Sequence, residues 1–236
     1  MQRNSFLLKV IKWGLAATLF LPLFVSNKLF FPFITGKNFL FRVLIEVLFL
    51  LWVFLVARDG SYRPKRSWIL IFVVAIIAIL TLSTIFSVDA NRSMWSNFER
   101  MEGLVGHIHL FLFFLMLVSV FKNERDWWWF FHVSFAVSLI IGFYALLQLA
   151  GVLAIHQGNT RIDATLGNAT YLAVYLLFHL FLLLYYYLKT PQTGWKIFYG
   201  AVFLFQTILL YYTATRGAML GFVGGLFVFG LIFGFS

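Results

Sequence analysis

The residue that most clearly indicates chemistry is Arg216, which stands between two long apolar stretches of the chain. From Lys196 to Thr215 the lysine is the only charged residue, and none follows Arg216 as far as Ser236. A guanidinium at or near a membrane boundary is costly unless an anion or a water-filled cavity receives it. Arg216 is therefore a candidate binding residue.

Three other arginines, Arg92, Arg100 and Arg161, lie in segments predicted to face the same side of a membrane as Arg216. Arginine is always charged and binds phosphate oxygens through two parallel hydrogen bonds. Two or three convergent arginines would bind a pyrophosphate, and a lipid-linked pyrophosphate is the expected ligand. Alternatively, these side chains reach lipid headgroups or pair with nearby acids. That alternative weighs more for Arg92 and Arg100 than for Arg161 and Arg216.

The composition is that of an integral membrane protein. Hydrophobic residues make up 62% of the chain and charged residues 11%, and the mean hydropathy is +0.93; soluble domains carry roughly 25% charged residues. The net charge of +10 comes from basic residues scattered over short loops, so no nucleic-acid partner is expected. The absence of cysteine excludes disulfides and thiolate chemistry, and no glycine-rich phosphate loop is found. We expect no cofactor.

Transmembrane helices must position these arginines, and the expected fold is an all-α polytopic bundle of about eight helices. One span needs about 20 apolar residues. The apolar runs predict helices at approximately 8–25, 39–57, 67–87, 104–121, 127–150, 168–188, 196–214 and 218–236. The first run could be a signal peptide, but Pro22 to Ser26 offers no small-x-small cleavage pair. We therefore expect an uncleaved first span.

The distribution of basic residues predicts that the N-terminus is cytoplasmic. Loops rich in Lys and Arg stay inside, and this orientation places 11 of the 18 basic residues inside and 7 outside. The expected arrangement is a single transmembrane domain over residues 1–236. Its external loops fall at about 26–38, 88–103, 151–167 and 213–217.

The external loops also carry acidic residues. The stretch from Ser87 to Gly103 contains Glu99 and Glu102, and its mixture of polar and aromatic residues predicts a short helix lying at the membrane interface. The next loop contains His156 and Asp163. We expect Glu99, Glu102 and Asp163 to orient the arginines, in preference to holding a divalent cation. No metal site is predicted.

His156 is a further supporting candidate, because a base near an acceptor hydroxyl would assist transfer. His107 and His109 also fall on the predicted outer side. A spacing of two residues puts them on different faces of a helix, so they are not expected to share a metal ion. The expected role of these two histidines is at the interface or in hydrogen bonding.

Several motifs resemble those of one known family. Arg161-Ile-Asp-Ala-Thr-Leu-Gly-Asn-Ala-Thr-Tyr-Leu-Ala-Val-Tyr-Leu resembles the Arg…Gly-Asn-Pro-Asn-x-Leu-Ala-x-Tyr-Leu pattern of the O-antigen ligase, O-antigen polymerase and O-oligosaccharyltransferase family. Thr213-Ala-Thr-Arg-Gly-Ala-Met-Leu-Gly resembles its Ser-Arg-Gly motif. Glu99-Arg-Met-Glu-Gly-Leu and Phe31-Pro-Phe-Ile-Thr-Gly-Lys resemble patterns that precede earlier helices. The resemblance covers about residues 28–224.

The resemblance implies a bacterial enzyme of the cytoplasmic (inner) membrane that acts in lipopolysaccharide or cell-envelope synthesis. Such enzymes transfer a glycan from an undecaprenyl pyrophosphate carrier to a hydroxyl of an acceptor glycolipid, glycan or protein, by ligation or polymerisation. It implies that Arg161 and Arg216, joined by Arg100, bind the pyrophosphate. Charge grows on that group as the sugar departs, and fixed donors stabilise it. Membrane lipid is the other expected partner.

The chain departs from the family pattern in two places. Ala169 and Thr170 stand where the family has Pro-Asn. The family's catalytic histidine lies in a large external loop beyond the Ser-Arg-Gly helix, so the catalytic base is expected beyond Ser236, with the chain truncated before it and inactive by itself. Two other functions remain open: a lipid-carrier flippase or transporter would place charges at mid-depth of the spans, and a non-catalytic scaffold would need none of the arginines.

Overall fold

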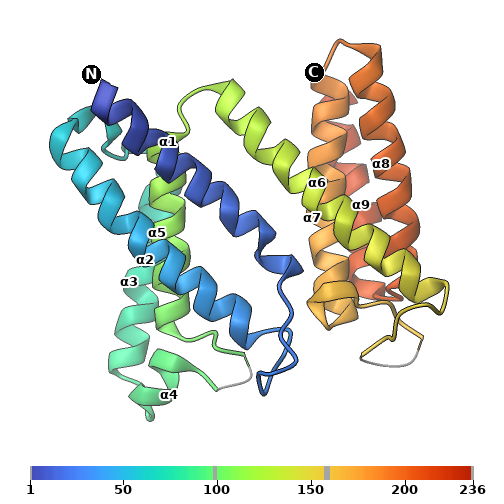
Figure 1. Cartoon of the computed structure of the whole chain (residues 1–236), viewed down its shortest axis with the longest axis horizontal. Helices are drawn as coiled ribbons and strands as arrows, with labels where there is room; N and C mark the ends of the chain where they lie inside the picture. The colour runs from blue at the N-terminus through green and yellow to red at the C-terminus, as the bar shows by residue number, and fades with distance from the viewer. Residues whose placement is uncertain (1, 98–99, 157–159, 235–236) are drawn as a thin grey trace. The chain divides into compact units, whose positions relative to one another are not determined.

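A computed structural model describes residues 2–97, 100–156 and 160–234 of the chain. Across these residues the protein is all-α, and helices and loops account for all of the structure (Figure 1). The α-helices are α1 (Gln2–Ala17), α2 (Thr35–Arg58), α3 (Trp68–Ile85), α4 (Ala90–Trp95), α5 (Leu104–Val120), α6 (Glu124–Leu149), α7 (Ala169–Lys189), α8 (Thr193–Tyr212) and α9 (Arg216–Gly234). Short 3-10 helices cover Thr18–Leu23, Gly60–Tyr62 and Ala164–Leu166.

The protein is a multi-pass membrane protein. Within the described residues, six helical segments are long and apolar enough to cross a bilayer, and two shorter apolar helices cover Leu104–Val120 and Arg216–Ile232. These eight segments coincide with the eight predicted spans to within a few residues at most ends. The short α4 lies in the loop for which an interfacial helix was predicted, and Asp89 caps it by accepting a hydrogen bond from the Arg92 backbone N–H at 2.9 Å.

The chain divides into two compact units, and each is described by itself. Unit 1 comprises Met1–Ser134. In it α2 packs against α1 and α5, while α3 and α4 pack against α5. Its buried core is aliphatic and aromatic, and within the otherwise apolar packing Trp52 Nε1 donates to Ser119 Oγ at 2.6 Å. The core includes Ile11, Leu15, Ile45, Leu48, Leu55, Met116 and Phe130.

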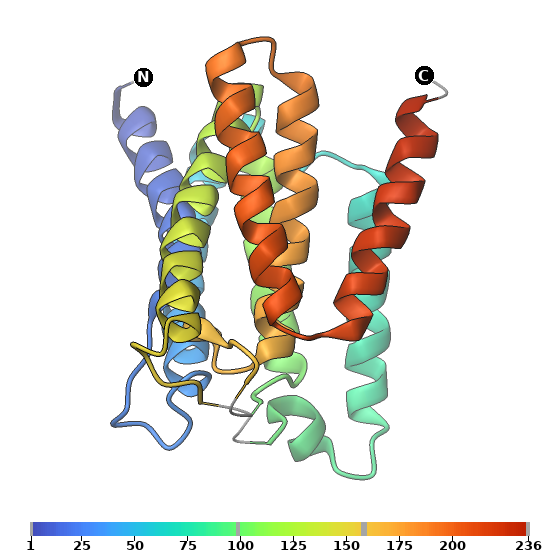
Figure 2. The ribbon, with the colours of Figure 1, turned by 90° about the vertical axis from the view of Figure 1, so that its right-hand side faces the viewer.

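Unit 2 comprises Phe135–Ser236 and contains the second half of α6, together with α7, α8 and α9. The antiparallel helices α7 and α8 pack closely, with Tyr199 fully buried and its ring 5.9 Å from that of Tyr186. The α6–α7 loop and the α8–α9 turn both lie at the lower end of this unit in Figure 2. That common end carries most of the polar residues discussed next.

Candidate functional site

Gln148, near the end of α6, organises the α6–α7 loop. The side chain is buried, with 3% exposure, and it bonds to two separate parts of the loop. Its Nε2 donates to the Ala154 carbonyl at 2.8 Å and to Asp163 Oδ1 at 2.7 Å, while its Oε1 accepts from the backbone N–H groups of Asp163 and Ala164 at 3.2 and 2.8 Å. One amide therefore fixes both sides of the loop. Sequence reasoning missed Gln148, although an isolated amide in an apolar run is a usable signal.

Asp163 is completely buried beneath this loop. Its Oδ2 accepts from the His156 backbone N–H at 2.9 Å, and its Oδ1 lies 3.5 Å from His156 Nδ1. The His156 side chain retains 34% exposure. The two supporting residues predicted from the sequence are thus joined to each other, with a buried carboxylate behind a partly exposed imidazole.

Arg161 reaches from this loop to the turn between α8 and α9. Its Nε donates to the Thr213 carbonyl at 2.9 Å, and its Nη2 donates to Thr215 Oγ1 at 2.9 Å. Thr215 Oγ1 also lies 3.5 Å from the carbonyl of Ala169, at the start of α7. These bonds use two of the five guanidinium N–H donors. Arg161 therefore fixes the turn that immediately precedes Arg216.

Arg216 is the first residue of α9 and its side chain is exposed. The preceding turn contains Ala214 in the left-handed region, with φ 49°, a conformation that costs a non-glycine residue about 1 kcal/mol. The N-terminus of a helix carries partial positive charge and unsatisfied N–H groups. An exposed arginine, a helix N-terminus and a second guanidinium bonded to the preceding turn are features that phosphate-binding sites commonly use.

The remaining predicted site residues belong to unit 1. Arg100 and Glu102 are exposed, and Glu99 lies outside the described residues. The Arg100 backbone N–H donates to Asn97 Oδ1 at 2.9 Å, and its carbonyl accepts from Asn38 Nδ2 at 3.5 Å. Arg100 is thus held at the start of α2 through its backbone.

Unit 1 also contains a group of ionisable residues between α2 and α5. Arg42 is 7% exposed and its Nη2 donates to the Met101 carbonyl at 2.8 Å. One turn further along α2, Glu46 Oε1 pairs with His109 Nε2 at 3.0 Å, and the Glu46 side chain is 62% exposed. Arg42 was not among the site residues predicted from the sequence. No group of three metal-ligating side chains occurs in the parts of the chain that the structure describes.

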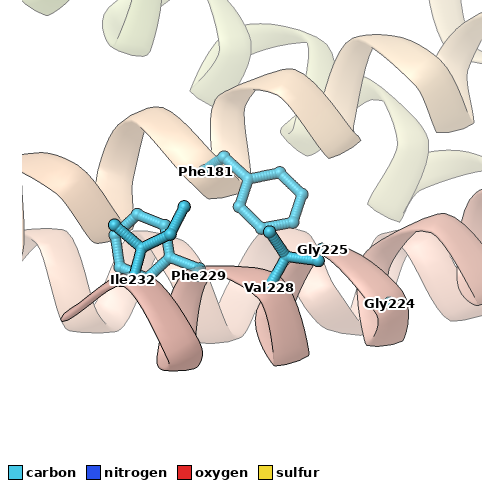
Figure 3. Close-up of a pocket in the computed structure, with 6 residues that line it drawn as sticks. All are labelled: Phe181, Gly224, Gly225, Val228, Phe229 and Ile232. Carbon is cyan, nitrogen blue, oxygen red and sulfur yellow. The ribbon is translucent and has the colours of Figure 1, made fainter. Parts of the chain in front are cut away.

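An apolar groove of about 390 Å³ runs along α9. Phe181 of α7 lines one side, and Gly224, Gly225, Val228, Phe229 and Ile232 of α9 line the other (Figure 3). Gly224 lies eight residues after Arg216 on the same helix, which corresponds to about 12 Å along its axis. The groove is lined by carbon alone and would accept a hydrocarbon chain.

Comparison with known proteins gives no assignment: no protein-family model, no curated protein and no solved structure matches this chain. The class that the structure defines is an all-α, multi-pass membrane protein. Its function is inferred from the site.

Proposed function

We propose that this protein is a lipid-linked glycan transferase of the O-antigen ligase type, which binds the pyrophosphate of an undecaprenyl carrier through Arg161 and Arg216 at the outer face of the cytoplasmic membrane. The observation that carries the proposal is the pair of hydrogen bonds by which Arg161 holds the Thr213–Thr215 turn directly before Arg216. The Arg161 guanidinium is thereby held at the turn that leads into Arg216, the first residue of α9. The site offers the fixed positive charge that a departing pyrophosphate needs.

The chemistry requires no protein nucleophile. An acceptor hydroxyl attacks the anomeric carbon, and the bond from that carbon to the pyrophosphate oxygen breaks with its electron pair on the pyrophosphate. Arginine stabilises the product better than lysine, because its planar fork binds two phosphate oxygens together. Support also comes from the apolar groove on α9, which offers a surface for the isoprenoid chain of a carrier whose head lies at Arg216.

A lipid-carrier transporter is the second candidate. The Glu46–His109 pair favours it, because ionisable residues inside spans are typical of transport pathways. The arginine site of unit 2 favours the transferase, since the arginines gather at a helix terminus next to a loop. A transporter would need the Glu46–His109 pair, whereas the transferase would need Arg161 and Arg216.

The test is transfer of glycan from undecaprenyl pyrophosphate to an acceptor in proteoliposomes, with binding of the donor measured separately. We expect Arg216→Ala, and nearly as strongly Arg161→Ala, to lower the rate about a hundredfold, or on the order of 3 kcal/mol in activation free energy. Arg216→Lys should recover part of this loss. Arg92→Ala is the matched control and should behave as the wild type. Wild-type turnover in Arg216→Ala would exclude the pyrophosphate role.

The orientation of the protein is tested by single-cysteine labelling, which is clean because the natural sequence has no cysteine. We expect an impermeant external reagent to label Asn91→Cys, Gly158→Cys and Thr215→Cys. Gly60→Cys, Asn123→Cys and Gln192→Cys should react only after the membrane is permeabilised. Labelling of Gly60→Cys from outside would reverse the topology and place the arginine site in the cytoplasm.

A further inference from the structure

The end of unit 1 that carries the α2–α3 and α5–α6 loops is strongly basic. Both loops lie at the upper end of this unit in Figure 1. Residues 58–67 and 122–126 contain six basic residues and three acids, whereas residues 87–103, the segment that contains α4, have two and three. The six basic side chains are all exposed: Arg58, Arg63, Lys65, Arg66, Lys122 and Arg125. An anionic partner therefore fits this surface.

Lys122 joins the two loops into one surface. Its Nζ donates to the Ser61 carbonyl at 2.8 Å and lies 3.9 Å from the centre of the Tyr62 ring. Asp59 shapes the same loop by accepting a hydrogen bond from the Ser61 backbone N–H at 2.9 Å. The loop ends at Ser67, whose side chain caps the start of α3. The basic residues between Ser61 and Ser67 are thus presented by a loop that is anchored on both sides.

Three of these cations have no partner within the described part of the protein. The side chains of Arg63, Lys65 and Arg66 form no hydrogen bond, ion pair or ring contact there. Asp126, an acid at the same end, is already paired with Lys12 at 2.7 Å. Exposed cations without an internal partner are available to an external anion.

Two tryptophans indicate the depth of this surface in the membrane. Trp68, the first residue of α3, is 76% exposed, and Trp128, near the start of α6, is 38% exposed. Tryptophan is enriched at the boundary between the lipid chains and water. Arg66 precedes Trp68 by two residues, and Arg125 precedes Trp128 by three. These cations therefore lie just outside the aromatic belt, at the level of the lipid phosphates.

We propose that this surface binds the headgroups of anionic phospholipids, with Arg63, Lys65 and Arg66 as the binding residues. The proposal does not depend on the transferase function. A zwitterionic headgroup carries the same phosphate, but its ammonium group cancels the charge, so the surface should select lipids with net negative charge. Each lysine or arginine near an anionic membrane surface contributes about fivefold in affinity. Cations that only set the topology would show no preference among lipids.

The experiment measures lipid binding to the intact purified protein by native mass spectrometry, with phosphatidylglycerol and phosphatidylcholine of the same acyl chains. We expect the wild type to bind phosphatidylglycerol at least tenfold more tightly. The triple variant Arg63→Gln/Lys65→Gln/Arg66→Gln should lose affinity for phosphatidylglycerol on the order of a hundredfold, and its affinity for phosphatidylcholine should not change. These three side chains make none of the bonds that anchor the loop, so the variant should fold as the wild type does.

A pair of single variants provides the matched control. Lys65→Gln and Lys28→Gln each remove one exposed lysine from unit 1. The first should weaken phosphatidylglycerol binding about fivefold, and the second should leave it unchanged. Glycerol phosphate at the concentration of the lipid should not displace it, because it lacks the acyl chains that hold the headgroup at this depth.

Three results would overturn the proposal. The first is equal affinity of the wild type for the two lipids, which would leave the basic residues with a role in topology alone. The second is an equal loss of phosphatidylglycerol binding in Lys28→Gln and Lys65→Gln, which would show a general effect of net charge. The third is displacement of the lipid by glycerol phosphate, which would identify a site for a soluble anion.

Discussion

Arg42 of unit 1 and Arg161 of unit 2 make the same kind of hydrogen bond in different surroundings. Each donates to a main-chain carbonyl at a left-handed turn: Arg42 to Met101, whose φ is 55°, and Arg161 to Thr213, which precedes Ala214 with φ 49°. Arg42 is buried, whereas Arg161 is partly exposed and adjoins the exposed Arg216. The comparison teaches that a buried arginine such as Arg42 of α2 can hold a neighbouring loop in a purely structural role. Solvent exposure and a second cation nearby are what set the candidate site of unit 2 apart.

The largest effect on stability is expected at Gln148, whose side chain holds the α6–α7 loop of unit 2. Gln148→Leu removes the partners of two backbone N–H groups and one oxygen of a buried carboxylate, so the free energy of unfolding should fall by about 3 kcal/mol or more. Gln206→Leu is the control in the same unit, because Gln206 donates only to Ser138 in the bonds described and should cost about 1 kcal/mol. Thermal unfolding in detergent measures both variants. Equal losses would contradict the role given to Gln148.

Arg42→Ala tests the comparison directly. It leaves the Met101 carbonyl without its charged donor and should lower the free energy of unfolding by about 2 kcal/mol. Donor binding per folded molecule should stay unchanged, whereas Arg161→Ala should weaken it. Binding is measured on protein separated from aggregates by size-exclusion chromatography. If Arg42→Ala abolished donor binding in folded protein, the division between a structural and a binding arginine would be wrong.

Glu46→Gln should have a smaller effect. The Glu46 side chain is mostly exposed, so its pair with His109 is expected to contribute less than about 1 kcal/mol. The transferase proposal predicts unchanged glycan transfer in this variant. A transporter would instead lose movement of the lipid carrier between leaflets, which a fluorescent carrier analogue reports in proteoliposomes. Loss of that movement in Glu46→Gln would indicate that the functional site lies in unit 1.

The smallest effect concerns the turn that Arg161 holds. Ala214→Gly relieves the left-handed strain and should stabilise the protein by up to about 1 kcal/mol, after the added backbone entropy of glycine is subtracted. Ala218→Gly, inside α9, should have the opposite sign at about 1 kcal/mol because it weakens a helix. Differential scanning fluorimetry of the two variants gives the signs. Destabilisation by Ala214→Gly would show that the turn is not strained.

The sequence by itself determined the membrane class and the eight apolar segments, because a bilayer imposes a fixed span length that composition reveals directly. It also picked out Arg216, since a charge between two apolar runs is conspicuous, and Arg161 through its polar loop and the motif that resembles the family's. It proposed His156 and Asp163 only as separate supporting residues.

Only the tertiary structure decided which of these residues act together. Arg161 and the Thr213 carbonyl that it binds are 52 positions apart, and Gln148 and Asp163 are 15 apart, so no local pattern connects them. Their bonds form because the α6–α7 loop folds over the end of the α7–α8 pair and must satisfy its buried polar groups there. Burial likewise distinguished Arg42 from Arg216, because solvent exposure depends on the packing of neighbouring helices and no single segment encodes it.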